Sequence, residues 1–320
     1  MNLCSGLSRG ATCRWVLSAV MFWCGAQQGA AAPLVPGTGY RITEVGDDFE
    51  EEDWKFETHF PKSSTNLDGE SRLPIGESTN GRIYESSYRG EPDVVKRVAT
   101  PPGGLPGSQG ALLMRSLYTG IPGVPTREFQ QDDLFVNVST RLGAPLSPAQ
   151  SPSIVVRVFF PPFDQWEQRT GSSFAVRADL EATSHRDTGR FFRRQMSKVE
   201  SYWPGLFVQF NCKRDGRDHD SAMLLIRADE MGHDVPGPEI TQTGWWTLGM
   251  SFTPDGMVHY YASPGVDRLT PADHLGSYTP YGFRTQKFSS FFFNIVNRND
   301  GRTWSTEWVI DDPALYVLHR

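Results

Sequence analysis

Cysteine is scarce in this sequence. Only four cysteines occur among 320 residues, and three of them, Cys4, Cys13 and Cys24, lie near the N-terminus. If that part of the chain is removed, only Cys212 remains, and a lone cysteine excludes an internal disulfide. About 290 residues bury enough apolar surface for one large core without such a crosslink. We expect Cys212 to be a small buried strand residue, not a reactive thiol.

Long hydrophobic runs are lacking as well. The one candidate, residues 15–25, follows Arg9 and Arg14 and precedes the small residues 30–32. This order is typical of a secretory signal peptide, and about ten apolar residues are too few for a membrane span, which needs roughly 20. Residues 1–31 are therefore predicted to be a signal peptide, and the mature protein is expected to be secreted or periplasmic. A buried N-terminal helix and a lipoprotein signal are the alternatives.

The chain has no excess of positive charge. Its formal net charge is −6 at pH 7, and loss of Arg9 and Arg14 with the signal peptide would leave −8. Nucleic acids and anionic membranes both favour basic patches on their partners. We therefore expect no nucleic-acid partner and, after signal cleavage, no membrane partner.

Helical periodicity is rare, with one weak pattern around residues 191–200. Glycine (31) and proline (23) instead separate short runs that are rich in Val, Phe, Trp and Tyr. Such runs indicate strands joined by turns, and their number favours an antiparallel sandwich or barrel. Twelve strands are predicted, at residues 53–59, 81–88, 110–117, 133–141, 153–160, 173–182, 205–213, 221–228, 245–253, 256–262, 288–297 and 304–318. They form one domain over residues 47–320, which follows a flexible lead-in at 32–46.

The clearest local prediction is a hairpin that begins at Trp245. Pro254, Asp255 and Gly256 lie between two alternating runs, and a glycine accepts the positive φ of a tight reversal. Side chains two residues apart share a face of a strand. The core face is predicted to carry Trp246, Leu248, Met250 and Phe252, with Val258, Tyr260 and Ala262 on the returning strand.

Three segments resemble those of a known superfamily. They are Gly46-Asp-Asp-Phe-Glu with Trp54, the hairpin from Trp245 through Gly256, and the closing Trp304-Ser-Thr-Glu-Trp-Val-Ile-Asp-Asp-Pro-Ala-Leu-Tyr. Together the sequence resembles the concanavalin A-like lectin/glucanase superfamily. This resemblance implies an all-β, antiparallel two-sheet jelly-roll sandwich. It leaves function open, because such sandwiches include lectins, hydrolases, lyases and adhesion modules.

Alternation also predicts a polar face opposite the core. In residues 173–182 the apolar positions alternate with Arg177, Asp179 and Glu181. The corresponding positions of other strands carry Arg157, Gln209, Asn211, Trp245, His259, Tyr261 and Asn294. If these strands share one sheet, charges, amides and aromatic rings meet on one surface, which is suited to a polysaccharide or other glycan. The alternative is an ordinary solvated sheet face.

The candidates for catalysis are weak. Asp179 and Glu181 on one strand face would lie about 5–7 Å apart, near the spacing of the two carboxylates in retaining glycosidases. However, the sequence has neither the Glu-x-Asp-x-x-Glu signature of the glucanases nor the arginine, glutamine-histidine and tyrosine blocks of alginate-lyase-like sandwiches.

Acidic residues at both ends of the domain suggest a structural calcium ion. Hard cations prefer several carboxylate and carbonyl oxygens, and first and last strands are often neighbours in jelly rolls. The candidate ligands are Asp47, Asp48, Glu50, Asp311 and Asp312. The alternative is that these acids face water.

Aromatic residues in two predicted loops, Trp166 and Trp203, are either stacking residues at the rim of a site or plugs of the core. The favoured functional hypothesis is an exported carbohydrate-binding or surface-interaction sandwich. A glycan-cleaving enzyme on the same fold, either a glycoside hydrolase or a polysaccharide lyase, and a structural extracellular module are the alternatives.

Overall fold

The computed structural model describes residues 33–319 except 122, 127 and 189–193. The predicted signal peptide lies outside the described residues, so export stays a prediction. Among the helices that are described, none has the length and apolar character needed to cross a membrane.

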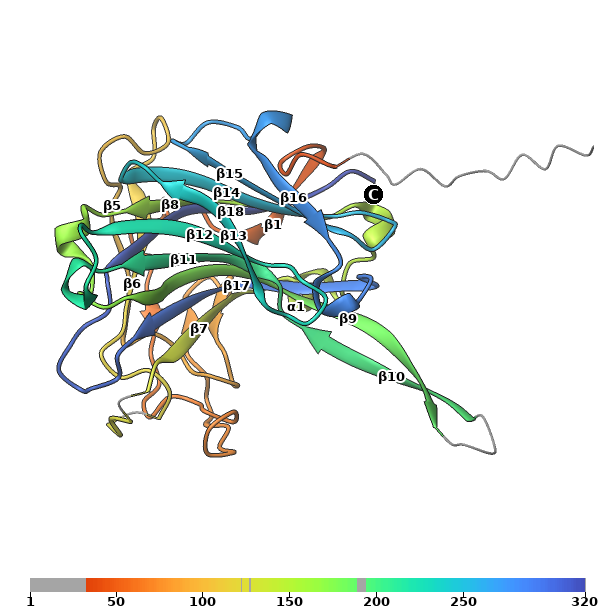
Figure 1. Ribbon diagram of the computed structural model, residues 1–320, viewed down its shortest axis with the longest axis horizontal. Helices are drawn as coiled ribbons and strands as arrows, with labels where there is room; N and C mark the ends of the chain where they lie inside the picture. The colour runs from red at the N-terminus through yellow and green to blue at the C-terminus, as the bar shows by residue number, and fades with distance from the viewer. Residues whose placement is uncertain (1–32, 122, 127, 189–193, 320) are drawn as a thin grey trace, which may run out of the picture. The chain divides into compact units, whose positions relative to one another are not determined.

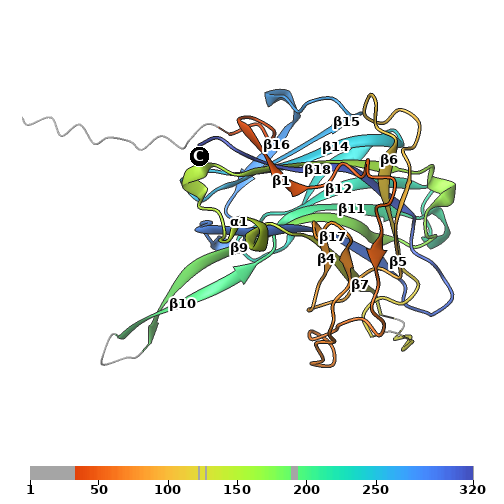
Figure 2. The ribbon, with the colours of Figure 1, turned by 180° about the vertical axis from the view of Figure 1, so that it is seen from behind.

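Two antiparallel sheets form the described domain (Figures 1 and 2). The first, sheet A, has the strand order β16 (His274–Tyr278), β15 (Val258–Pro264), β14 (Gly244–Phe252), β8 (Ser153–Phe160), β18 (Trp308–Val317), β6 (Gly110–Arg115) and β5 (Val94–Ala99), with β1 (Tyr40–Gly46) paired to β18. The second, sheet B, has the order β13 (Asp234–Ile240), β12 (Ser221–Arg227), β11 (Gly205–Asn211), β9 (Gly171–Thr188), β17 (Lys287–Asn297), β7 (Gln130–Val136), β4 (Ile83–Glu85), β3 (Glu77–Ser78) and β2 (Phe56–Glu57), with β10 (Arg194–Tyr202) paired to β9.

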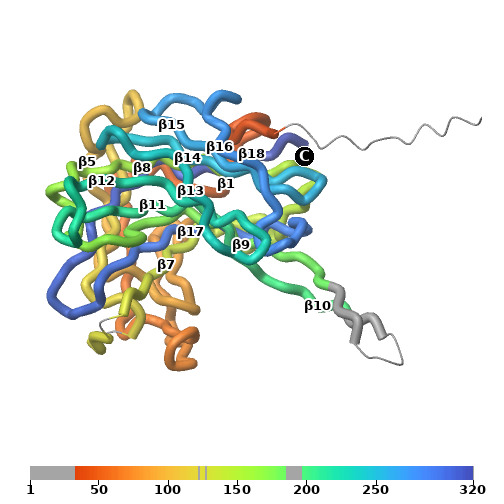
Figure 3. The backbone as a smooth tube through the Cα atoms, in the orientation of Figure 1, coloured from red at the N-terminus to blue at the C-terminus, as the bar shows by residue number. Residues whose placement is uncertain are grey.

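Helical segments are short and lie in the connections. They are α1 (Ser139–Leu142) and the 3₁₀ turns Pro148–Gln150, Phe163–Gln165, Lys213–Asp215, Pro271–Asp273 and Pro280–Gly282. Most of the long connections of the first half of the chain, orange and yellow in Figure 3, lie below β7 in that view, whereas the connection between β5 and β6 lies beside β5.

The core lies between the two sheets because every second side chain of each long strand points inward. Trp308 of β18 is fully buried and packs against Phe174 of β9 at 4.9 Å between ring centroids, so it joins the two sheets. Trp166 packs against the Trp308 ring at 4.9 Å between centroids and is itself buried, so it fills part of the core. The predicted all-β, antiparallel two-sheet jelly-roll sandwich is confirmed.

The predicted hairpin is also confirmed. Strands β14 and β15 pair with Leu248 opposite Ala262, and Gly256 in the turn has a φ of 79°. All seven side chains predicted for its core face belong to the buried core.

Each of the twelve predicted runs contains an observed strand, but six strands were not predicted. These are β1, β3, β5, β10, β13 and β16. The helix expected around residues 191–200 is wrong, because Arg194–Tyr202 forms β10 and pairs with β9 along its whole length. In Figure 1 this hairpin extends away from the two sheets.

The lead-in that was expected to be flexible packs on sheet A from Leu34 onward. Leu34 accepts a hydrogen bond of 2.6 Å from the Ser251 hydroxyl through its carbonyl oxygen. Residues 40–46 then form β1 against β18. The expectation fails because Gly39 and Gly46, with φ values of 94° and 84°, let the backbone approach the last strand closely.

Candidate functional site

One row of side chains crosses the outer face of sheet B at the same level of six strands. Its members in strand order are Tyr84, Phe135, Phe292, Arg177, Gly205 and Arg227. The rings of Phe135 and Phe292 stack at 4.4 Å with only 3° between their planes, and Tyr84 lies 5.6 Å from Phe135. Direct cross-strand neighbours are close enough for such contacts. The row therefore forms an aromatic floor with a cationic end.

Gly205 makes room for Arg177 in this row. A Cβ atom at position 205 would lie 2.6 Å from the Cγ atom of Arg177. The Arg177 guanidinium lies over the Phe292 ring at 5.3 Å and over the Phe207 ring at 5.2 Å. It donates hydrogen bonds of 2.7 and 3.1 Å to the carbonyl oxygen of Trp203. Burial lowers the pKa of Arg177 to about 10, so the group remains a cation at neutral pH.

Asp133 is a buried counterion beside this floor, on the same face of β7 as Phe135. Its carboxylate accepts hydrogen bonds from the Asn294 amide and, at 3.0 Å, from Gln131. Asn294 also accepts from Arg177 at 3.3 Å, which links the cation to the carboxylate through an amide. Burial raises the pKa of Asp133, while the positive charges of Arg177 and Arg89 oppose this shift. The network fixes the Arg177 side chain in one position.

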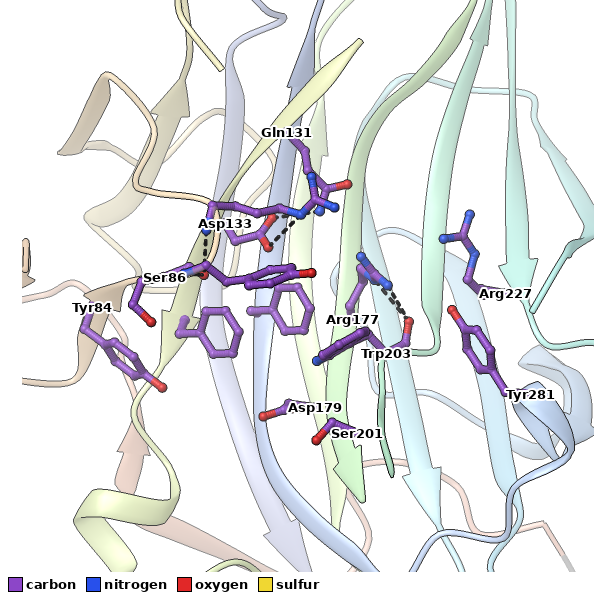
Figure 4. A pocket seen from close by; sticks show the side chains of 15 residues that line it. Tyr84, Ser86, Gln131, Asp133, Arg177, Asp179, Ser201, Trp203, Arg227 and Tyr281 are labelled. Atoms are coloured by element: carbon purple, nitrogen blue, oxygen red, sulfur yellow. Dashed lines mark hydrogen bonds and ion pairs between the residues drawn. The ribbon is translucent and has the colours of Figure 1, made fainter. Parts of the chain in front are cut away.

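Two walls turn the floor into a groove of about 500 Å³ (Figure 4). One wall is the loop 86–89, and the other consists of Trp203 and Tyr281. The rings of Tyr88 and Trp203 face each other at 6.2 Å between centroids with 23° between their planes, so the two walls approach each other at this point. At the far end, Arg227 lies over Phe207 at 4.4 Å and forms a two-point ion pair of 2.9 and 3.0 Å with Asp234.

A buried lysine anchors the chain just after the loop 86–89, at Glu91. Lys62 is fully buried and donates 2.8 Å to Asp132 and 3.0 Å to the carbonyl oxygen of Glu91. Burial raises the pKa of Glu91 to about 8 and that of Asp132 to about 7. The chain next to this wall of the groove is therefore anchored by buried polar and charged groups, Lys62, Glu91 and Asp132.

Asp179 is the titrating carboxyl of the groove. It lies on β9 two residues beyond Arg177, beside Ser201 in Figure 4. Burial raises its pKa to about 6, with the Trp203 side chain opposing and Glu181 adding to the shift. Burial and the Asp179 charge together raise the pKa of Tyr84 to about 12. The groove thus contains a carboxyl that changes charge near neutral pH next to a tyrosine that stays protonated.

Six of the predicted ligand-binding residues share the outer face of sheet B. Arg177 and Asp179 line the groove, and Asn294 supports Arg177. Glu181 instead forms an ion pair of 2.9 Å with Lys287. The remaining two, Gln209 and Asn211, hydrogen-bond to each other at 3.2 Å further along β11. Whether the six bind a glycan stays a prediction.

Four other candidates lie on sheet A and are not brought to this face: Arg157, Trp245, His259 and Tyr261. The reason is that alternation identifies the face of a strand but not the sheet to which that strand belongs. Trp245 is 5% exposed, packs against Phe159 at 5.5 Å and donates to the carbonyl oxygen of Pro101. His259 is buried between the hydroxyls of Thr253 and Ser277. Trp245 and His259 therefore contribute to packing on the outer side of sheet A.

The five acids proposed as calcium ligands are engaged elsewhere. Asp47 accepts from the Trp54 indole at 2.9 Å, Glu50 from the amide of Gln109 at 2.9 Å, and Asp311 from Ser108 at 2.9 Å. Asp48 accepts from the amide of Glu50, and Asp312 forms ion pairs with Arg41 and Arg157. Within the described part of the chain, no group of three or more His, Cys, Asp or Glu side chains is arranged to hold a metal ion.

Most residues of the groove were not named from the sequence. Trp203 was expected either at a rim or in the core, and it lies at the rim. Phe292 was detectable, because three consecutive phenylalanines cannot all face inward on one strand, so the middle one must point outward. Tyr88, Arg89 and Tyr281 are in loops and carry no such signal.

No protein-family model matches the chain, and no curated protein matches its sequence. Solved structures similar to it include a carbohydrate esterase of the Shiga toxin-encoding bacteriophage phi24B, with 11% identity, 80% of this chain and 96% of the other covered, and a TM-score of 0.43. An endo-β-1,4-glucuronan lyase of Trichoderma reesei matches at 11% identity, 74% and 92% coverage, and a TM-score of 0.37. A PL7 alginate lyase of Zobellia galactanivorans matches at 9% identity, 82% and 92% coverage, and a TM-score of 0.34. At these TM-scores the likenesses carry no argument about ligand or activity.

Proposed function

We propose that the groove on sheet B binds a carbohydrate chain. The observation that carries this proposal is the cross-strand row from Tyr84 to Arg177, with the Tyr88 and Trp203 rings beside it. Sugar rings present apolar C–H faces that pack on aromatic planes, while their hydroxyls need planar polar partners. The groove offers both kinds of surface within about 500 Å³.

Trp203 allows this proposal to be tested without disturbing the core. The full chain is assayed for retention on a panel of neutral and acidic polysaccharides, and the dissociation constant is measured for those retained. Loss of one stacking ring is worth about 1.4 kcal/mol, so Trp203→Ala is expected to weaken binding about tenfold. Trp304→Ala is the matched control, because Trp304 is also half-buried and contacts one charged group, Arg115, away from the groove.

Two results would contradict the proposal. One is that no polysaccharide of the panel is retained by the wild-type chain. The other is that Trp203→Ala and Trp304→Ala change retention equally, since this would place the binding surface outside the groove.

Cleavage of the bound glycan is a second candidate function. It is favoured by Asp179, a carboxyl that titrates near neutral pH in a groove beside a protonated tyrosine. The same panel discriminates the two functions, because a binding protein returns the polysaccharide intact. An enzyme releases new reducing ends or unsaturated products.

A further inference from the structure

A second cavity lies on the outer face of sheet A, on the opposite side of the sandwich from the groove. Its volume is about 470 Å³. Three arginines from separate parts of the chain line it together with the turn at residues 36–39 and Tyr316. They are Arg41 of β1, Arg157 of β8 and Arg268 of the loop after β15.

The arginines outnumber their counterions. Asp312 forms ion pairs with two of them, with Arg41 at 2.5 Å and with Arg157 at 2.9 Å. Arg268 is exposed and forms no ion pair within the described part of the chain. Three guanidinium groups and the carboxylates of Asp312 and of Asp311, the cross-strand neighbour of Arg157, give this cluster a formal charge of +1.

Arg157 has a donor without an acceptor. The residue is 7% exposed, and its Nε atom has no hydrogen-bond partner among the described residues. Buried donors are nearly always paired, because leaving one unpaired loses the hydrogen bond that water would have made. The Nε atom itself is enclosed by protein, but Arg157 lines the cavity and is incompletely hydrogen-bonded, which favours an acceptor from outside the chain at this cavity.

The backbone is shaped to bring these groups together. Asp312 has a φ of 47° where the register of β18 against β8 shifts, an uncommon conformation for a residue other than glycine. Gly39 lies so close to the last strand that a Cβ atom would be 2.4 Å from the carbonyl oxygen of Val317. This close approach brings β1 beside β18 (Figure 2). From β1, Arg41 forms its ion pair with Asp312.

We propose that this cavity binds a divalent tetrahedral oxyanion, sulfate or phosphate, as the free ion or as the end group of a larger molecule. Guanidinium groups recognise such anions through paired N–H donors. A tetrahedral oxyanion presents several acceptor oxygens, so it can accept hydrogen bonds from more than one of the three arginines at once. The site is separate from the carbohydrate groove and does not depend on its function.

The test is a calorimetric titration of the full chain with inorganic sulfate and with inorganic phosphate at constant ionic strength. One saturable site is expected. Loss of one charge-assisted contact is expected to weaken binding about tenfold in Arg268→Gln. Arg217→Gln is the matched control, since Arg217 is an exposed arginine in the loop after β11, and it is expected to bind like wild type.

Binding should also survive in Trp203→Ala, which separates this site from the groove. The inference is overturned if neither ion gives a saturable signal, or if Arg268→Gln and Arg217→Gln bind equally. Phenyl sulfate and phenyl phosphate distinguish the two sources of the anion. Tighter binding of an ester supports recognition of an end group, and tighter binding of the inorganic ion supports a free-ion site.

Discussion

The outer faces of the two sheets carry similar residue types but differ in what covers them. On sheet A the lead-in lies over β14 through Leu34 and Pro36, and the loop at Pro101 covers Trp245. On sheet B the central strands are left open between the loop 86–89 and Trp203, and the groove results. A tryptophan on one face therefore completes a packed layer, while a tryptophan on the other is available to a ligand.

The comparison shows that a polar or aromatic residue opposite the core is not by itself a binding residue. On both sheets an arginine stands at the centre of the outer face, and each is less than a tenth exposed. Arg177 is held by a carbonyl oxygen and an amide between two aromatic rings, whereas Arg157 shares the carboxylate of Asp312 with a second arginine. The two arginines should therefore respond differently to the same substitution.

The largest expected effect is on stability. Replacing Arg177 by Met leaves the buried Asp133 with only the long ion pair of 4.0 Å to Arg89, and this loss of compensation for a buried carboxylate is expected to cost about 3 kcal/mol. Arg157→Met leaves Asp312 paired with Arg41, so a loss of only about 1 kcal/mol is expected. Urea denaturation of both variants measures the difference. Equal losses would show that the two faces do not differ in this respect.

The sequence was sufficient for the fold class and for local pairing. The hairpin from Trp245 follows from alternation and a turn with Gly256, both of which are local. Assignment of strands to sheets is not local, and for this reason Trp245 and Arg177 were expected on one surface. Strand β13 was missed because Pro236 and Pro238 interrupt it. It can accommodate them because it is an edge strand, where proline does not break an internal ladder.

The site was harder to predict than the fold. The alternation of apolar and polar residues predicted Arg177 and Asp179, but their partners come from distant parts of the chain. Asp133 meets Arg177 only because β17 pairs with both β7 and β9. Gly205 leaves space for the Arg177 side chain because it has no side chain of its own. This role cannot be predicted without the register that places Gly205 opposite Arg177.

Adding a single methyl group tests that support. In Gly205→Ala the new Cβ atom would lie 2.6 Å from Arg177 Cγ and 2.6 Å from the carbonyl oxygen of Val176. The backbone oxygen cannot yield, so overpacking is expected to cost about 2 kcal/mol and to displace Arg177. Denaturation measures the first effect, and retention on the polysaccharide that binds wild type measures the second.

Gly249→Ala is the corresponding change on sheet A. Its Cβ atom would lie 2.6 Å from Leu269 Cδ1 and 2.8 Å from Pro36 Cβ, which are side chains of the covering segments. These can move, so a smaller loss of stability with unchanged retention is expected. If Gly249→Ala weakens retention as much as Gly205→Ala does, the groove is not the binding surface.

The smallest effect concerns pH and compares two carboxyls, one on each face. Burial raises the pKa of both Asp179 and Asp311 from an ordinary value of 3.8 to about 6. The folded chain therefore holds these protons more tightly than the unfolded chain. The stability that each contributes is fully present below pH 3.8 and is lost as the pH rises through about 6. Because Asn cannot ionise, Asp179→Asn and Asp311→Asn should each flatten this fall.

Ligand binding separates the two carboxyls. Asp179 lines the groove and Asp311 does not, so retention should change through about pH 6 in wild type and in Asp311→Asn but not in Asp179→Asn. Glu91 and Asp132 titrate at higher pH in all three proteins, so the informative quantity is the difference from wild type. A pH-dependence of retention that disappears in Asp311→Asn would place the titrating group outside the groove. One that persists in Asp179→Asn would assign it to a carboxyl other than Asp179, such as Asp133. In the first case, the open face of sheet B would take no more part in polysaccharide binding than the covered face of sheet A.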